Sequence, residues 1–180
     1  MKNIILTGAQ GTGKTTVLNM FKENTDYNVI TEVVRNLSKK GIKINEQGNE
    51  EGQKTIFNCY LDTFNEHQND LCSNWISDRG LTDVLSYSYY HYTKGDLSLD
   101  EMNWEIYQLC KFNKSNPNIL YVYFPIEFDV VDDGVRSIDP EYRKNIDSYI
   151  KKILDLAHIN YITVTGTPQE RYDYIMKHAD

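Results

Sequence analysis

The N-terminal stretch MKNIILTGAQGTGKTTVL, residues 1–18, decides the fold. Residues 4–6 are a short apolar run of the kind that fills a buried parallel strand. Residues 8–15 follow and match the phosphate-binding loop pattern, which is a glycine, four further residues and then Gly-Lys-Thr. Val17 and Phe21 continue at helical spacing. The sequence therefore predicts a strand, a phosphate-binding loop and a helix in direct succession.

Each position of this loop has a physical role. Glycines let the backbone adopt positive φ and approach a ligand closely, and successive amide N–H groups together with the helix dipole favour a bound phosphate. Lys14 can reach the β- and γ-phosphates, and the Thr15 hydroxyl can ligate Mg²⁺. A glycine-rich turn that binds nothing is the plainer alternative, but this pattern between a strand and a helix rarely arises by chance. The nucleotide-binding residues expected from the loop are Gly8, Gln10, Gly11, Thr12, Gly13, Lys14, Thr15 and Thr16.

Composition and charge narrow the class of protein. The chain has 180 residues and a net charge of −7. This length fits one domain over residues 1–180, and the charge disfavours broad non-specific binding to nucleic acid, although a local basic cleft is compatible with it. The chain lacks the ~20 apolar residues of a membrane span, and its first apolar run is too short for a signal peptide. Cys59, Cys72 and Cys110 lack metal-type spacing, so we expect reduced thiols in a cytoplasmic protein.

Further apolar segments alternate along the chain with amphipathic ones. Strands are expected at 28–31, from Trp75 to Asp78, at 119–124 and at 161–164. Helices are expected at 32–40, 51–72, 81–92, 139–157 and 168–177, with a further helix that begins at a capping box of Ser98 and Glu101. Residues 42–50 are polar and predict a loop. This alternation predicts an α/β fold with a parallel sheet covered on both faces.

Asp78 is the second feature that indicates chemistry. It ends a strand expected beside the first one, so its carboxylate would face the phosphate loop at the carboxyl edge of the sheet. It could hold Mg²⁺, directly or through water, or accept a proton from an attacking hydroxyl; a simple strand-end turn is the alternative. Arg79 could bind a phosphate or carboxylate of an acceptor, or form a surface salt bridge. Glu32 and Arg35 share one helix face and could bind acceptor hydroxyls, or they could pair with each other at a helix start.

A polar segment later in the chain carries arginines. Arg136 and Arg143 flank it, and Gly134 allows it to hinge, so we expect a lid region at 125–143 that closes over a transferring phosphoryl group; solvated surface arginines are the alternative. Residues 166–168 with Arg171 follow the last strand and could pack on a nucleotide base.

Two other patterns in the sequence imitate functional motifs that the remaining residues do not support. Residues 93–96, Thr-Lys-Gly-Asp, imitate the guanine-reading motif of GTPases. They lie near a tyrosine-rich helical stretch, and Asp-Arg-Gly at 78–80 stands where a GTPase would have its Asp-x-x-Gly switch. The four histidines lack ligand spacing, so no metal other than nucleotide-bound Mg²⁺ is expected.

With these residues assembled, the chain resembles the AAA-like P-loop kinases that include the nicotinamide-riboside kinase domain of the bacterial NAD-salvage regulator. It is more distantly similar to thymidylate and deoxynucleoside kinases. The matching pieces occur in family order and are residues 8–16, 32–35, 77–80 with Asp83 and Tyr87 downstream, 133–136, and Gly166 with Arg171.

The resemblance implies a P-loop NTPase three-layer sandwich with strand order 2-3-1-4-5, ATP as the phosphoryl donor and an arginine-bearing lid. It implies catalytic roles for Lys14, Asp78, Glu32 and Arg136, with Thr15 and Asp78 at the metal. It places the acceptor near Glu32, Arg35, Asp78, Arg79 and Tyr87. The Asp-Arg pair at 78–79 is closer to thymidylate kinases than to the Asp-x-Asp of the riboside kinase, so the acceptor is left open.

Three functions are compatible with these residues and with the resemblance. The first is a kinase that moves the γ-phosphoryl of ATP to a nucleoside, a nucleotide or a nicotinamide-riboside-like small molecule. The second is a phage-type kinase acting on DNA with a hydroxymethylated base or on a polynucleotide end, which the acidic charge disfavours. The third is an ATP-hydrolysing switch; Arg79 counts against it because such ATPases commonly place a catalytic Glu at that position. A homodimer is left open.

Overall fold

The computed structural model describes residues 1–31, 33–68, 74–129 and 139–180, and in these residues five parallel strands form one sheet. The strands are β1 (Asn3–Thr7), β2 (Asn28–Ile30), β3 (Trp75–Asp78), β4 (Ile119–Tyr123) and β5 (Tyr161–Thr163). Their order across the sheet is β2-β3-β1-β4-β5, and each neighbouring pair is parallel. The expected fold class and strand order are therefore confirmed.

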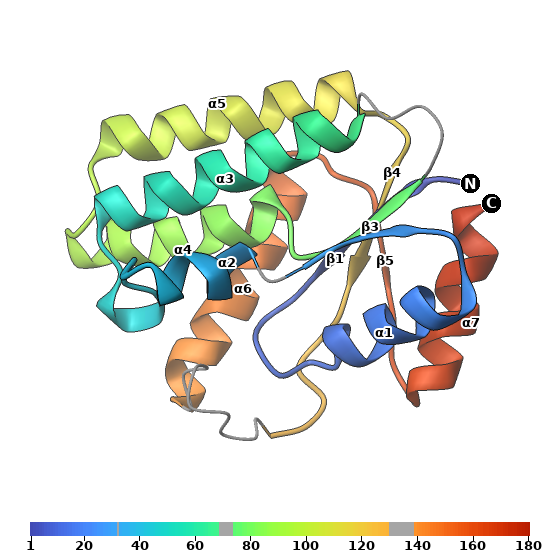
Figure 1. The fold of residues 1–180 in the computed structure, drawn as a ribbon. Coiled ribbons are helices and arrows are strands. Elements are labelled where there is room, and N and C mark those ends of the chain that lie inside the picture. The colour runs from blue at the N-terminus through green and yellow to red at the C-terminus, as the bar shows by residue number, and fades with distance from the viewer. Residues whose placement is uncertain (32, 69–73, 130–138) are drawn as a thin grey trace.

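Helices connect the strands and cover both faces of the sheet (Figure 1). They are α1 (Lys14–Asn24), α2 (Val33–Lys39), α3 (Glu50–Gln68), α4 (Leu81–Lys94), α5 (Leu99–Ser115), α6 (Pro140–Leu156) and α7 (Pro168–Ala179), with a short 3-10 turn, η1 (Asn45–Gln47), inside the segment expected to be a loop. Each of these helices is too short or too polar to cross a lipid bilayer.

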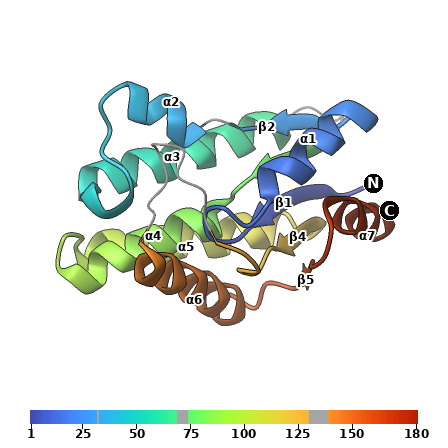
Figure 2. The same cartoon turned by 90° about the horizontal axis from the view of Figure 1, so that it is seen from below.

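The strands bury side chains on both faces because a residue and its neighbour point to opposite sides of a strand. On β1, Ile4 and Leu6 pack into a cluster with residues of α1 and α7. Ile5 points the other way, into a larger cluster formed with α3, α4, α5 and α6. Figures 1 and 2 show these two groups of helices on opposite sides of the sheet. The buried run of β1 thus holds together the three layers and fixes where its C-terminal loop emerges.

Helix α4 extends two residues beyond the expected end at residue 92 and stops at Gly95, which adopts the left-handed conformation with φ 81°. The Thr-Lys-Gly-Asp sequence at 93–96 is therefore the C-terminal end of a helix and the turn that follows it. Residues 93–96 do not line the main cavity described below.

The capping box expected at Ser98 and Glu101 is only half formed, which corrects the sequence analysis. The Ser98 hydroxyl accepts a hydrogen bond from the Glu101 amide at 3.2 Å. However, the Glu101 carboxylate pairs with Lys54 of α3 at 2.9 Å instead of reaching back, and the amide of Ser98 donates to Glu50. Tertiary partners from α3 have replaced the local one. A full capping box forms at the start of α7 instead, between Thr167 and Glu170.

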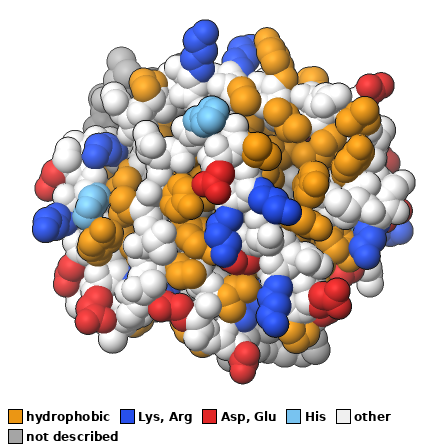
Figure 3. All heavy atoms as spheres, turned by 180° about the vertical axis from the view of Figure 1, so that it is seen from behind, with side chains coloured by type: hydrophobic (Ala, Val, Ile, Leu, Met, Phe, Trp, Pro, Cys, Tyr) orange, Lys and Arg blue, Asp and Glu red, His pale blue; other side chains and the backbone are white. Residues whose placement is uncertain are grey.

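The outer face of α5 carries exposed apolar side chains. Leu99, Ile106 and Tyr107 remain 56%, 42% and 63% exposed. From behind, hydrophobic side chains gather beside basic ones on the side of the molecule where α5 lies (Figure 3). This face lies on the opposite side of the molecule from the phosphate loop that joins β1 to α1 (Figure 1).

Candidate active site

The parallel register of β1 and β3 brings the phosphate loop and Asp78 together. Leu6 of β1 pairs with Asp78 of β3, and the amide of Arg79 donates to the carbonyl of Leu6 at 2.9 Å. Both strands therefore end at the same edge of the sheet, where ligands bind in open α/β folds. The Thr15 hydroxyl, in the first turn of α1, donates to Oδ2 of Asp78 at 3.0 Å.

The loop glycines adopt conformations that other residues rarely take. Gly8, Gly11 and Gly13 have φ of 146°, 70° and 91°. A side chain on Gly8 would also clash, because its Cβ would lie 2.5 Å from the carbonyl oxygen of Phe124. The loop therefore needs glycine at this position both for its dihedral angles and for its contact with the end of β4.

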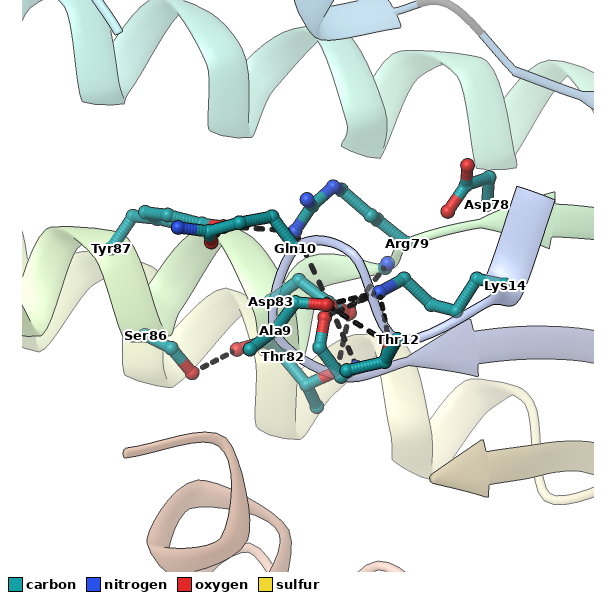
Figure 4. A network of polar contacts seen from close by, with 12 residues as sticks. Ala9, Gln10, Thr12, Lys14, Asp78, Arg79, Thr82, Asp83, Ser86 and Tyr87 are labelled. Atoms are coloured by element: carbon teal, nitrogen blue, oxygen red, sulfur yellow. Dashed lines mark hydrogen bonds and ion pairs between the residues drawn. The ribbon is translucent and has the colours of Figure 1, made fainter. Parts of the chain in front are cut away.

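Lys14 lies across the loop rather than pointing into solvent. It is 4% exposed, and its Nζ donates to the carbonyl oxygens of Gly8 and Ala9 at 2.6 and 2.7 Å and to the Thr12 hydroxyl at 3.1 Å. Figure 4 shows the ammonium group within the turn of the loop. The ammonium thus contributes positive charge at the loop, and Lys14 is among the residues that line the main cavity.

Asp83 anchors the loop from α4, and sequence reasoning had given it no role beyond the family match. Its Oδ1 accepts a hydrogen bond from the amide of Gly8 at 3.1 Å, and its Oδ2 accepts one from the amide of Gly80 at 3.0 Å. Burial raises the pKa of the Asp83 carboxyl, while the nearby Arg79 guanidinium, 3.8 Å away, opposes that rise. The signal in the sequence was its position three residues after Gly80, where a helix-capping carboxylate belongs.

Arg79 and Tyr87 form a chain of contacts that ends at the loop (Figure 4). Arg79 has φ 82°, unusual for a residue other than glycine. Its Nη1 donates to the Tyr87 hydroxyl at 3.1 Å, which in turn donates to Oε1 of Gln10 at 3.0 Å. The guanidinium also lies over the Tyr87 ring, 5.4 Å from its centre. Arg79 is therefore held at the cavity wall by Tyr87 and Asp83, and it is not the surface salt bridge considered as the alternative.

Arg143 lies in a different place from the one expected of a lid arginine or a solvated surface residue. It is 4% exposed and donates to the carbonyl oxygens of Gln10, Gly11 and Phe128 at 2.9, 3.1 and 2.7 Å. The reason is that α6 packs against α4, which directs this side chain beneath the phosphate loop. A guanidinium held in this way does not swing over a ligand, so the lid role expected for Arg143 is corrected.

Arg171 also reaches the loop. It is 3% exposed, and its Nη1 donates to the carbonyl oxygen of Thr12 at 2.7 Å. It also pairs with Glu127 and donates to the carbonyl oxygen of Gly166. Sequence reasoning placed Arg171 against a nucleotide base. In the structure its hydrogen bonds go to the protein, while Gly166, Pro168 and Arg171 itself all line the cavity.

A cavity of about 360 Å³ joins these parts. Its wall includes the whole segment 10–17, Asp78 and Arg79. It also includes Thr31, which follows β2, Arg35 of α2 and Tyr60 of α3. A smaller cavity of about 60 Å³ shares four wall residues with it, namely Val34, Ile44, Asn45 and Arg79. Of the expected site residues, Thr15, Thr16 and Arg35 are exposed on the main wall. Glu32 and Arg136 lie outside the described residues, as does the central part of the expected lid, residues 130–138.

The oxygen atoms of Thr15 and Asp78 fit a divalent cation. Mg²⁺ prefers hydroxyl, carboxylate and water oxygens, and it is usually held by one or two protein groups plus the phosphates of a nucleotide. Oδ2 of Asp78 accepts from Thr15, whereas its buried Oδ1 has no hydrogen-bond partner within the described part of the chain. An unpaired buried carboxylate oxygen is costly unless a cation or water satisfies it.

The fold and the loop together define a P-loop nucleotide-binding protein. A family model described as an AAA domain matches residues 3–171, so the chain belongs to that family. No curated protein sequence matches the chain significantly.

Solved structures share the fold at low sequence identity. Deoxyadenosine kinase from M. mycoides with bound dATP aligns with a TM-score of 0.69 and 14% identity, covering 99% of this chain and 98% of that chain. NadR protein in complex with NR aligns with a TM-score of 0.69 and 16% identity, covering 98% of this chain and 50% of that chain. A NadR complex with NAD and AMP-PNP aligns with a TM-score of 0.68 and 14% identity, covering 99% of this chain and 49% of that chain. The chain thus spans about half the length of NadR and nearly all of the deoxyadenosine kinase.

Proposed function

We propose that this protein is an ATP-dependent kinase that transfers the γ-phosphoryl group to a nucleoside, a nucleotide or a nicotinamide-riboside-like acceptor. The observation that carries the proposal is the shared wall of the main cavity. One side is formed by residues 10–17 of the phosphate loop and the start of α1, and the other includes Asp78, Arg79 and residues of α2. A triphosphate on the loop would therefore lie beside a second group of polar side chains, as transfer between two bound substrates requires.

On the donor side, the loop amides and Lys14 would stabilise the charge that develops on the transferring group. Gly166 and Pro168 line the same cavity and would pack against the nucleotide base. When bound, Mg²⁺ at Thr15 and Asp78 would neutralise phosphate charge. The relatives support this assignment to ATP, since their structures carry dATP or AMP-PNP.

On the acceptor side, the smaller cavity supports a planar ring as ligand. Its walls combine apolar side chains, including Ile56 and Val84, with the amide of Gln53. Gln53 is 2% exposed, and its Oε1 has no hydrogen-bond partner among the described residues. A heterocycle that presents an N–H or amino group would satisfy that oxygen, whereas an apolar ligand would leave it unpaired. The NadR complex with NR and the deoxyadenosine kinase both favour this class of acceptor.

The proton from an attacking hydroxyl would pass to Asp78 or Glu32, and Arg35 and Arg79 would hold the acceptor. Arg136 would close over the transferring group, as the resemblance implies. Phosphoryl transfer of this kind depends on positioning and electrostatics, so no covalent nucleophile is required.

We also propose a cellular compartment for the kinase and a surface for contact between two copies. We place the kinase in the cytoplasm because Cys59 and Cys110 are free thiols. The exposed apolar face of α5 is the candidate contact surface should the chain form a homodimer.

The test is ATP turnover measured with a panel of nucleosides, nucleotides, nicotinamide riboside and DNA. ADP release that depends on one small acceptor, with a phosphorylated product, supports the proposal. Product formed only on DNA supports the polynucleotide-kinase alternative, and ADP with free phosphate but no phosphorylated product supports the ATP-hydrolysing switch.

A further inference from the structure

Arg143 contacts two successive carbonyl groups of the phosphate loop with one guanidinium. Its Nε donates to the carbonyl oxygen of Gln10 at 2.9 Å and its Nη2 to that of Gly11 at 3.1 Å. Its remaining Nη1 donates to the carbonyl oxygen of Phe128, after β4. The planar guanidinium presents its N–H groups in a fixed fork, so it fixes the two peptide units relative to each other.

Arg171 contacts the next carbonyl group along the same loop. Its Nη1 donates to the carbonyl oxygen of Thr12 at 2.7 Å, while its Nη2 pairs with the carboxylate of Glu127. The two arginines come from α6 and α7, on opposite sides of the sheet. Three successive loop carbonyls, those of residues 10, 11 and 12, are therefore engaged by two buried cations.

The orientation of these carbonyls fixes the orientation of three amides. The described chain contains no cis peptide bond, and in a trans peptide unit the C=O of one residue and the N–H of the next point in opposite directions. Holding the carbonyls of residues 10–12 against the arginines therefore directs the amides of Gly11, Thr12 and Gly13 away from them. All three residues line the main cavity. Amides aligned in this way form an anion-binding concavity.

We propose that Arg143 and Arg171, together named the arginine brace, are positioning residues that hold the amides of Gly11, Thr12 and Gly13 in the orientation that binds a triphosphate. The inference rests on the proposed nucleotide-binding function and adds to it two residues that act through the backbone. These hydrogen bonds go to the protein's own carbonyl groups, so the brace would lower the conformational entropy that a glycine-rich loop loses on binding.

The experiment compares Arg143→Lys and Arg171→Lys with the wild-type protein and with Lys144→Met. The lysine variants keep the buried charge but lose the fork. Lys144 is an exposed neighbour of Arg143 on α6, so its variant removes a charge without touching the loop. The probe is inorganic tripolyphosphate, which tests the amides without a nucleoside, and its affinity is measured by calorimetry at a temperature where circular dichroism shows each protein folded.

The brace predicts that each lysine variant binds tripolyphosphate about tenfold or more weakly, equal to a loss of ~1.4 kcal/mol. It also predicts shifted amide resonances of Gly11 and Gly13 in the ligand-free variants with isotope-labelled glycine, which a general loss of stability would not produce. Lys144→Met should bind as the wild type does. Glu127→Gln, which weakens the ion pair of Arg171 without removing a buried cation, serves as the milder variant and should reduce affinity by a smaller factor.

Two results would distinguish failure of the proposed function from failure of the arginine brace alone. Wild-type protein that binds no tripolyphosphate would overturn the proposed function together with the brace. Wild-type protein that binds it while the lysine variants and Glu127→Gln bind it equally well, with unmoved glycine resonances, would overturn the brace alone.

Discussion

The hydroxyl of Thr15 donates to the carboxylate of Asp78 at 3.0 Å, although 63 positions separate the two residues in the sequence. The contact arises because β1 and β3 are neighbours in the sheet and end at the same edge. Thr15 lies in the first turn of the helix that follows one strand, and Asp78 ends the other strand. The fold therefore places a hydroxyl and a carboxylate together beside the phosphate loop.

Replacing Asp78 should separate catalysis from binding. In Asp78→Asn the side chain keeps its shape and its contact with Thr15 but loses its negative charge, so Mg²⁺ placement and proton acceptance weaken. We expect kcat to fall by ~10²–10³-fold, a typical effect of removing one charged group that acts on the transition state. Nucleotide affinity, measured by calorimetry with a non-hydrolysable ATP analogue, should change far less. An equal loss in both quantities would contradict a role in transfer.

Lys14 should be required for turnover but not for the fold. Lys14→Ala removes the ammonium that contacts the carbonyl groups of Gly8 and Ala9, and with it the positive charge at the phosphates. We expect most of the activity to be lost while far-ultraviolet circular dichroism stays native. Lys22→Ala, at the far end of the same helix, is the matched control. Activity of Lys14→Ala near the wild-type level would refute the assignment of the loop.

Gln53 should govern acceptor affinity. In Gln53→Leu the buried Oε1 that lacks a partner among the described residues is replaced by an apolar group of similar size. Removing such an orphaned acceptor is neutral or stabilising, so the melting temperature should be maintained or raised. The KM for the acceptor should nevertheless rise, with the KM for ATP unchanged. An unaltered acceptor KM would place the acceptor elsewhere in the cavity.

Glu105 should make stability depend on pH. Its side chain is fully buried between α4 and α5 and accepts a hydrogen bond from Ser88 at 3.0 Å. Burial raises the pKa of Glu105 from its ordinary value of 4.5 to about 8, with Glu101 adding to the rise and Ser88 and Lys54 opposing it. Between these two pH values the folded protein keeps a proton that the unfolded chain has released, so the unfolding free energy falls as the pH rises through this window.

The measurement is urea unfolding of the wild type and Glu105→Gln at several pH values. Glutamine mimics the protonated side chain and does not titrate, so the variant should gain stability relative to the wild type from pH 4.5 toward pH 8. A difference that stays constant over this range would show that Glu105 does not hold a proton in the folded state.

Sequence patterns were sufficient for the sheet and for the phosphate loop because both depend on local signals. The apolar run at 4–6 and the Gly-Lys-Thr of the loop each specify a short segment on their own. Asp78 was expected to face the phosphate loop because it ends a strand expected beside the first one, and the family resemblance added the full strand order. Contacts between residues far apart in the sequence were harder to predict. Arg143 lies 133 positions from Gln10, and the sequence contains no feature that specifies its burial under the loop.

The capping box was expected wrongly because other side chains compete for the same hydrogen-bonding groups. Ser98 and Glu101 have the spacing of a capping box, but Lys54 and Glu50 of α3 bind the groups that would have closed it. Asp83 is the opposite case, since a carboxylate at a helix start also holds the amide of Gly8 in the loop. Both outcomes depend on which helices pack together, and local spacing does not encode that.

The most direct test of the account follows a radiolabelled γ-phosphoryl group of ATP in the presence of each candidate acceptor. We expect the label to appear on a small nucleoside-like molecule with the wild-type protein, and far more slowly with Asp78→Asn. Label recovered only as inorganic phosphate, whatever acceptor is present, would contradict the central claim that this cavity joins two substrates for transfer.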